Sequence, residues 1–209
     1  MGSINKVITG ILLSGCGYVL AKDITIIEKS DSNKNSAIVI VDMQEQAKDK
    51  ETVDPDLMLD FVYLTRREEM ITNQRAVLDY GIARGIPVYV LEIPEYTPTI
   101  QPLAVGDVFY HPTNLAGGFH AQNRMRVTLE DELRRQDVDQ LLVMGIYQSF
   151  CVFDFVINGV ERGYSVLLAN DLMADPMFLT RDPGIARGRY SRDPLITYKD
   201  NYTDLLPLL

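Results

Sequence analysis

Four short runs of consecutive apolar residues restrict most strongly what this chain can fold into. Strands that are buried on both faces of a sheet show such unbroken runs, whereas half-exposed strands alternate apolar with polar residues. The runs lie at 37–41, 87–91, 141–144 and 164–169, and weaker strand patterns lie at 108–110 and 195–198. The sequence therefore predicts several buried parallel strands.

Helical patterns occupy the gaps between these runs. Apolar residues recur at helical spacing within 70–84, 129–138 and 151–162. Gly85 and Gly163 follow two of these segments, where glycine commonly ends a helix. Strands that alternate with helices form parallel sheets covered by helices on both faces. We therefore expect an α/β protein with a three-layer α/β/α, Rossmann-like fold and a mostly parallel central sheet.

Charge and composition narrow the classes of partner. The 209 residues are 46% hydrophobic and 23% charged, as in an ordinary globular domain. The net charge is −9 and no run of Lys and Arg occurs, whereas a nucleic-acid surface needs a basic stripe. The two cysteines and two histidines do not have zinc-site spacings. We expect a small-molecule substrate, no nucleic-acid partner, no metal and no cofactor.

The first 35 residues differ from the rest of the chain. Lys6 precedes the apolar stretch 7–13, which leads into Leu13-Ser14-Gly15-Cys16, an order similar to that of a bacterial lipoprotein signal. The alternative is an N-terminal strand or arm. We therefore divide the chain into 1–35, an N-terminal arm or lipoprotein-type signal plus linker, and 36–209, the main domain. The expected location is the cytoplasm or, with a lipidated Cys16 as the membrane contact, the periplasmic side of a membrane.

Two strand ends carry reactive side chains, and ligands of parallel α/β folds bind at such ends. Asp42 directly follows the run at 37–41, where a carboxylate acts as a general base or caps the next turn. Cys151 lies between the run at 141–144 and the next helix. A helix N-terminus lowers a thiol pKa and can hold an oxyanion. The alternative for Cys151 is a buried structural cysteine.

Several short motifs recur in a defined order: Val-Asp-Met-Gln at 41–44, Pro-Val at 87–88, Gly-Ile-x-x-x-x-Cys-Val at 145–152, Gly-Tyr-x-Val at 163–166, and Asp171. Together they resemble the isochorismatase-like cysteine hydrolase superfamily. The resemblance implies a catalytic triad of aspartate, lysine and cysteine, in which Asp42 and Cys151 match.

The resemblance also implies further site residues. It places a non-proline cis peptide at Ile146–Tyr147, which would aim the backbone N–H groups of Tyr147 and Cys151 at an oxyanion. Gln44 and Phe119 are expected to bind substrate, Phe119 because it resembles an aromatic residue that lines the site in the family.

The triad lysine is where this sequence departs from the family. No Lys occurs between Lys50 and Lys199, and the segment that should carry it holds His111. An imidazolium at His111 could supply the missing positive charge, although histidine is charged less reliably than lysine at neutral pH. The alternative is that His111 is an ordinary loop residue and the triad is broken. Arg124 is a more remote substitute.

The combined expectation is a cysteine-dependent hydrolase of a small amide or related C–N substrate that works through an acyl-enzyme. The alternative is a catalytically impaired protein of the same family with a binding or assembly role. Nicotinamidases of this family carry a metal site with two histidines after the second strand, and the segment 91–100 has no histidine, which disfavours that activity. Family members usually assemble, so we expect a homo-oligomer.

Overall fold

The structure, a computed structural model, describes residues 35–44, 59–94, 96, 98–111, 118–175 and 188–209. These residues belong to one compact unit, 34–209. The predicted N-terminal arm or lipoprotein-type signal, with Cys16, lies outside the described residues. No helix within the described part of the chain is long and apolar enough to cross a membrane.

A seven-stranded sheet forms the centre of this unit, and every strand pair described in it is parallel. The strand order is β3-β2-β1-β4-β5-β7, and β6 pairs with β4 beyond the end of β5. The α/β class and the parallel sheet predicted from the sequence are confirmed. The strands are β1 (Ser36–Val41), β2 (Val88–Glu92), β3 (Asp107–Tyr110), β4 (Gln140–Ile146), β5 (Ser165–Ala169), β6 (Met173–Ala174) and β7 (Ile196–Lys199).

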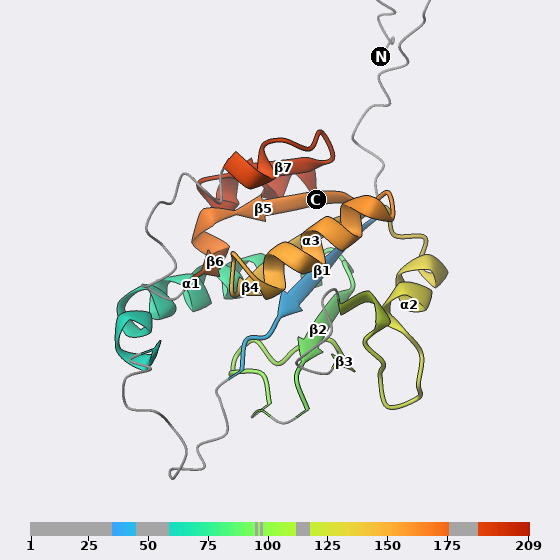
Figure 1. Cartoon of the computed structure of the whole chain (residues 1–209), viewed down its shortest axis with the longest axis horizontal. Helices are drawn as coiled ribbons and strands as arrows, with labels where there is room; N and C mark the ends of the chain where they lie inside the picture. Colours follow the sequence, from blue (N-terminus) through green and yellow to red (C-terminus); the bar gives the residue numbers. More distant parts are fainter. Residues whose placement is uncertain (1–34, 45–58, 95, 97, 112–117, 176–187) are drawn as a thin grey trace, which may run out of the picture. The chain divides into compact units, whose positions relative to one another are not determined.

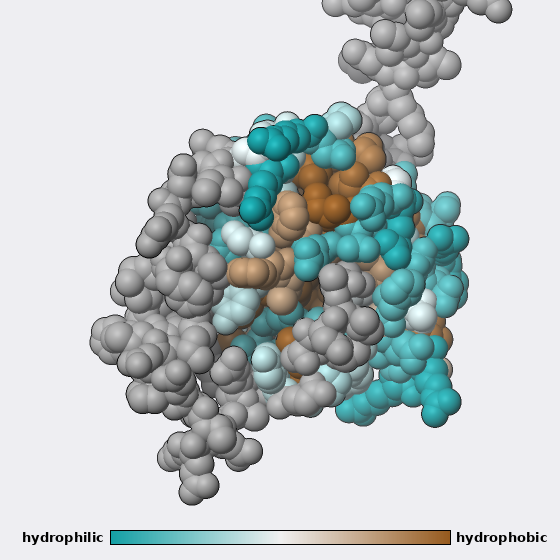
Figure 2. Space-filling view, viewed as in Figure 1, coloured by the Kyte–Doolittle hydropathy of each residue, from teal (hydrophilic) through white to brown (hydrophobic). Residues whose placement is uncertain are grey.

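Helices cover both faces of the sheet (Figure 1). They are α1 (Leu59–Ile82), α2 (Leu129–Arg135) and α3 (Cys151–Glu161), with short 3-10 turns η2 (Gly118–His120), η3 (Asn170–Leu172), η4 (Tyr202–Asp204) and η5 (Leu206–Leu208). Figure 1 shows α3 in front of the sheet and α1 behind it. In the space-filling view of the same face, hydrophobic surface lies over α3 (Figure 2).

Strand β1 shows why its sequence is an unbroken apolar run. Ala37, Val39 and Val41 join the core cluster that contains residues of α2 and α3, whereas Ile38 and Ile40 join the cluster that contains residues of α1. Successive side chains of a strand point to opposite faces, so a strand between two helical layers needs apolar residues at every position. The core therefore has two halves, one on each side of β1.

Gly145 allows β1 and β4 to lie close together at their carboxyl ends. Its φ is +137°, and a Cβ at this position would lie 2.1 Å from the carbonyl oxygen of Val41. Only glycine adopts such a backbone conformation readily. The residue after Val41 is Asp42, so this close approach helps to place Asp42 relative to the strand that leads to Cys151.

We expect Gly145→Ala to lower the free energy of unfolding by roughly 2–4 kcal/mol, because backbone strain and overpacking each cost about 1–3 kcal/mol. Gly163→Ala is the matched control, since Gly163 also has a positive φ of +89° but a Cβ there would meet nothing within 4 Å. Urea unfolding of both variants measures the difference. Equal destabilisation of the two variants would contradict a steric role for Gly145.

Candidate active site

Three of the predicted site residues follow the carboxyl ends of parallel strands. Asp42 comes directly after β1, His111 directly after β3, and Cys151 is the first residue of α3, which follows β4. His111 and Asp42 are in direct contact, with His111 Nε2 2.8 Å from Asp42 Oδ1, and both side chains are buried. The structure thus places His111 beside Asp42. The hypothesis that His111 replaces the triad lysine requires this position, while the catalytic role of His111 stays a prediction.

The β2 strand between β1 and β3 holds the backbones of both residues. The N–H of Asp42 donates to the carbonyl of Leu91 at 3.2 Å, and the N–H of His111 donates to the carbonyl of Glu92 at 2.9 Å. Asp42 has a φ of 51°, in the left-handed region, which aspartate tolerates better than most residues. Backbone bonds therefore fix where the carboxylate and the imidazole meet.

The second carboxylate oxygen of Asp42 is available for chemistry. Oδ1 is bonded to His111, whereas Oδ2 is buried and has no fully formed hydrogen bond to any described residue. A buried carboxylate oxygen without a donor carries a desolvation cost that a nearby acidic proton relieves. The thiol of Cys151 interacts with this carboxylate, and we expect Oδ2, which His111 does not occupy, to accept its proton.

The environment raises the pKa of Cys151 from its ordinary value of 9.0 to about 12. Burial contributes most, followed by the negative charge of Asp42 and the hydrogen bond between the two groups, with a small contribution from Asp154. A hydrogen bond with the backbone of Tyr147 acts in the opposite direction. The lowered thiol pKa expected from the helix N-terminus is therefore wrong, because burial and the neighbouring carboxylate outweigh the helix dipole.

The loop between β4 and α3 begins with the expected cis peptide, between Ile146 and Tyr147. Ile146 is buried at the end of β4, and Tyr147 is partly buried against the core cluster on the α1 side. The carbonyl of Tyr147 accepts hydrogen bonds from the N–H groups of Phe150 at 3.0 Å and Val152 at 3.1 Å. These bonds fold the loop tightly onto the first turn of α3, at Cys151.

Gln44 makes a structural contact within the protein, and its expected contact with substrate stays a prediction. Its amide oxygen accepts from the N–H of Ile93 at 2.7 Å, and its amide nitrogen donates to the carbonyl of Ile93 at 3.1 Å. The buried side chain therefore continues the β1–β2 pairing beyond the strand ends.

Phe119 does not line the site. Its ring is fully buried, stacks on Phe155 of α3 at a centroid distance of 4.6 Å, and also stacks on Tyr164 at 5.6 Å. The Arg162 guanidinium lies over the same ring at 4.8 Å. The family resemblance predicted a substrate contact for Phe119, but packing against α3 makes it part of the core.

Two carboxylates near the site were not identified from the sequence. Glu92 at the end of β2 is buried and accepts from the N–H of Thr99 at 2.7 Å. Asp175, just after β6, binds the N–H and the hydroxyl of Ser149 in the loop before Cys151. No local pattern links residue 175 to residue 149, so only the fold shows this contact.

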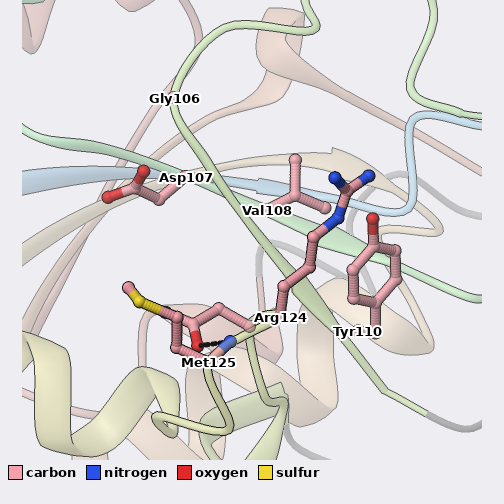
Figure 3. A pocket seen from close by; sticks show the side chains of 7 residues that line it. Gly106, Asp107, Val108, Tyr110, Arg124 and Met125 are labelled. Atoms are coloured by element: carbon pink, nitrogen blue, oxygen red, sulfur yellow. Dashed lines mark hydrogen bonds between the residues drawn. The ribbon is translucent and has the colours of Figure 1, made fainter.

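Arg124 lies in a separate hollow of about 280 Å³ along β3. Figure 3 shows its side chain extending beside the ring of Tyr110, with Val108 behind it and Asp107 further along the hollow. Arg124 is exposed. In the described structure His111, and not Arg124, is the basic side chain in contact with Asp42.

The described residues hold no group of three or more His, Cys, Asp or Glu side chains arranged to bind a metal ion. Asp171 has the structural role expected for it, because its carboxylate accepts from the N–H of Tyr202 at 2.9 Å and from Asn73 of α1 at 3.4 Å. Burial raises the pKa of Asp171. These contacts tie η3 to α1 and η4, away from the Asp42–His111 pair.

The fold and the site together define an α/β protein of the hydrolase type, with an acidic residue and a cysteine facing each other across strand ends. The chain belongs to the isochorismatase family, because the model of the Isochorismatase domain matches residues 36–198. The family resemblance predicted from the sequence motifs is confirmed.

The proteins similar to this chain include the following three. A nicotinamidase of Escherichia coli (strain K12) is 29% identical over 79 residues, which is 35% of this chain and only 37% of the nicotinamidase. A cysteine hydrolase from Pseudomonas syringae pv. phaseolicola 1448A has a TM-score of 0.62 at 16% identity, covering 83% of this chain and 92% of that one. The YcaC gene product of Escherichia coli, an octameric hydrolase of unknown specificity, has a TM-score of 0.59 at 16% identity, covering 84% and 79%.

We expect alkylation of Cys151 by iodoacetamide to be slow at pH 8 and still to accelerate above pH 10, because the pKa of the thiol is about 12. Asp42→Asn removes the negative charge but keeps an acceptor for His111. The thiol pKa should then fall, and the labelling rate at pH 8 should rise roughly tenfold for each unit of that fall. The thiol pKa should stay above 9.0, because burial, the largest cause of its rise, remains.

The rate profile from pH 7 to 11, read by mass spectrometry of the Cys151 peptide, tests this assignment. A wild-type rate that becomes constant above about pH 10 would show an ordinary thiol, and one already constant above about pH 8.5 would show an activated thiol.

Proposed function

We propose that the protein is a cysteine-dependent hydrolase of a small amide or related C–N substrate and that it works through an acyl-enzyme. The observation that carries this proposal is the buried contact of Asp42 with His111 beside the Cys151 thiol. A base, a group that orients it and a nucleophile at a helix start are the parts that acyl transfer requires.

Each step of the proposed reaction has a residue assigned to it. Oδ2 of Asp42 takes the thiol proton while the sulfur of Cys151 attacks the substrate carbonyl, and the N–H groups of Tyr147 and Cys151 stabilise the resulting oxyanion. Protonated Asp42 then gives its proton to the leaving amine as the C–N bond breaks. Water attacks the thioester, Asp42 takes a proton from it, and the acid product leaves as the thiol is restored.

The raised thiol pKa fits this sequence of events. A thiol whose pKa is about 12 is neutral at pH 7, so attack has to be coupled to proton transfer instead of starting from a stored thiolate. In this mechanism His111 donates a hydrogen bond from Nε2 to Oδ1 of Asp42. Nε2 must carry the proton, because an ionised carboxylate can only accept. That bond keeps Oδ2 turned to the thiol.

The names of the similar proteins support the class of substrate. The nicotinamidase is an amide hydrolase by name, and the structure from Pseudomonas syringae is a cysteine hydrolase. The octameric state of the YcaC gene product supports the prediction from the sequence that this chain forms a homo-oligomer.

The impaired-protein alternative rests on a specific observation, namely that histidine stands where the family has lysine. A histidine beside Asp42 that only satisfies a buried carboxylate would preserve the fold without supporting acyl transfer. The two readings differ in whether Cys151 becomes acylated, which a direct chemical test can decide.

We expect p-nitrophenyl acetate to acetylate Cys151, as read by mass spectrometry of the intact chain and of its Cys151 peptide. Cys151→Ala should give no adduct there. His111→Gln should slow acylation on the order of 10²-fold, as expected for loss of a group that supports a general base. His111→Lys, which restores the family's residue type, should keep more activity than His111→Gln.

His120→Gln is the matched control, because His120 on η2 is exposed and contacts Arg162 instead of Asp42. It should acylate at the wild-type rate. No adduct on wild-type Cys151 would favour the impaired-protein alternative, and equal rates in His111→Gln and wild type would remove His111 from the mechanism.

A further inference from the structure

The loop that leads into Cys151 is hydrogen-bonded to residues that follow β5 in the sequence. Oδ1 of Asp175 accepts from the N–H of Ser149 at 2.8 Å, and Oδ2 accepts from the Ser149 hydroxyl. Both oxygens of one carboxylate thus bind one residue, which lies two positions before the thiol. Such a two-point contact restrains orientation as well as position.

Further contacts from the same part of the chain restrain Gln148, the residue before Ser149. Its N–H donates to the carbonyl of Ala174 at 3.0 Å, and its own carbonyl accepts from the Tyr190 hydroxyl at 2.6 Å. Tyr190 is fully buried, and burial raises its pKa, so its hydroxyl stays protonated and can donate this bond. Strand β6, directly before Asp175, pairs with β4 through Gly145 and Ile146.

Residues 148 and 149 of the loop are therefore bonded to the part of the chain that follows β5, and among these bonds the two from Asp175 lie nearest to Cys151 in the sequence. Asp175 cannot help an oxyanion by its charge, because a carboxylate repels a developing negative charge. The two donors of Ser149 already occupy its oxygens. The role left for Asp175 is therefore positional: it fixes the direction in which nearby backbone N–H groups point.

We propose that Asp175 is a positioning residue that orients the backbone N–H groups of Tyr147 and Cys151 toward the substrate oxyanion, acting through Ser149. The proposal rests on the proposed function, since an oxyanion forms only if Cys151 attacks a carbonyl. Displacement of about 1 Å in such groups lowers rates on the order of 10²-fold.

Two reactions of the same thiol separate positioning from general damage. Acylation by p-nitrophenyl acetate passes through an oxyanion, whereas alkylation by iodoacetamide displaces iodide from a saturated carbon and forms none. Asp175→Ala should slow acylation between 10- and 100-fold, as an order of magnitude, and should change alkylation at pH 9 by no more than about twofold. Asp175→Asn should restore most of the acylation, because its amide can accept from the Ser149 N–H and donate to the Ser149 oxygen.

Asp193→Ala is the matched control, since Asp193 also accepts a backbone N–H, that of Leu195 at 2.9 Å, but in the turn before β7. It should leave both reactions unchanged. Wild-type acylation in Asp175→Ala, or equal loss of acylation and alkylation, would overturn the positioning role.

Hydrogen exchange distinguishes failure of this inference from failure of the proposed function. If wild-type Cys151 is not acylated at all, the proposed function fails, but the restraint itself is still measurable. Asp175→Ala should then speed amide exchange in peptides that span 145–152, while Asp193→Ala should not. Unchanged exchange in Asp175→Ala would overturn the inference independently of activity.

Discussion

The buried contact between Asp42 and His111 is the interaction on which the arrangement of this site depends. A carboxylate at the end of a fully buried strand carries a large desolvation cost unless it is paired. The β1 run places Asp42 at that point, and the chain offers no lysine in the segment where its relatives would. His111, 2.8 Å away, satisfies one carboxylate oxygen and leaves the other beside the thiol.

That pairing also determines the state of the nucleophile. Burial raises the Cys151 pKa most, and the charge and hydrogen bond of the same carboxylate raise it further, so the pKa is about 12. A helix N-terminus stabilises a thiolate only when burial and neighbouring charges do not oppose it. The resting site is thus a neutral thiol beside a base, and not a preformed thiolate.

Sequence patterns were sufficient where a feature depends on neighbouring residues. The unbroken apolar run of β1 indicated burial on both faces of the sheet. The positions directly after β1 and β3 identified Asp42 and His111 as site residues. Features that depend on contacts between distant residues were missed or misassigned. Strand β6 has only two residues, too few for a strand pattern, and α1 begins at Leu59, well before the apolar spacing at 70–84.

The charges gathered at this edge of the sheet bear on the substrate. The chain has a net charge of −9, and Asp42, Glu92 and Asp175 all lie at or beside the ends of β1, β2 and β6. A negative field slows the approach of anions, and an anionic group placed against Asp42 would meet repulsion that one histidine offsets only in part. A neutral amide avoids that cost, and its charge appears only as the oxyanion, at the backbone N–H groups that Asp175 is proposed to orient. For the proposed hydrolase, these three described carboxylates therefore favour uncharged substrates over anionic ones.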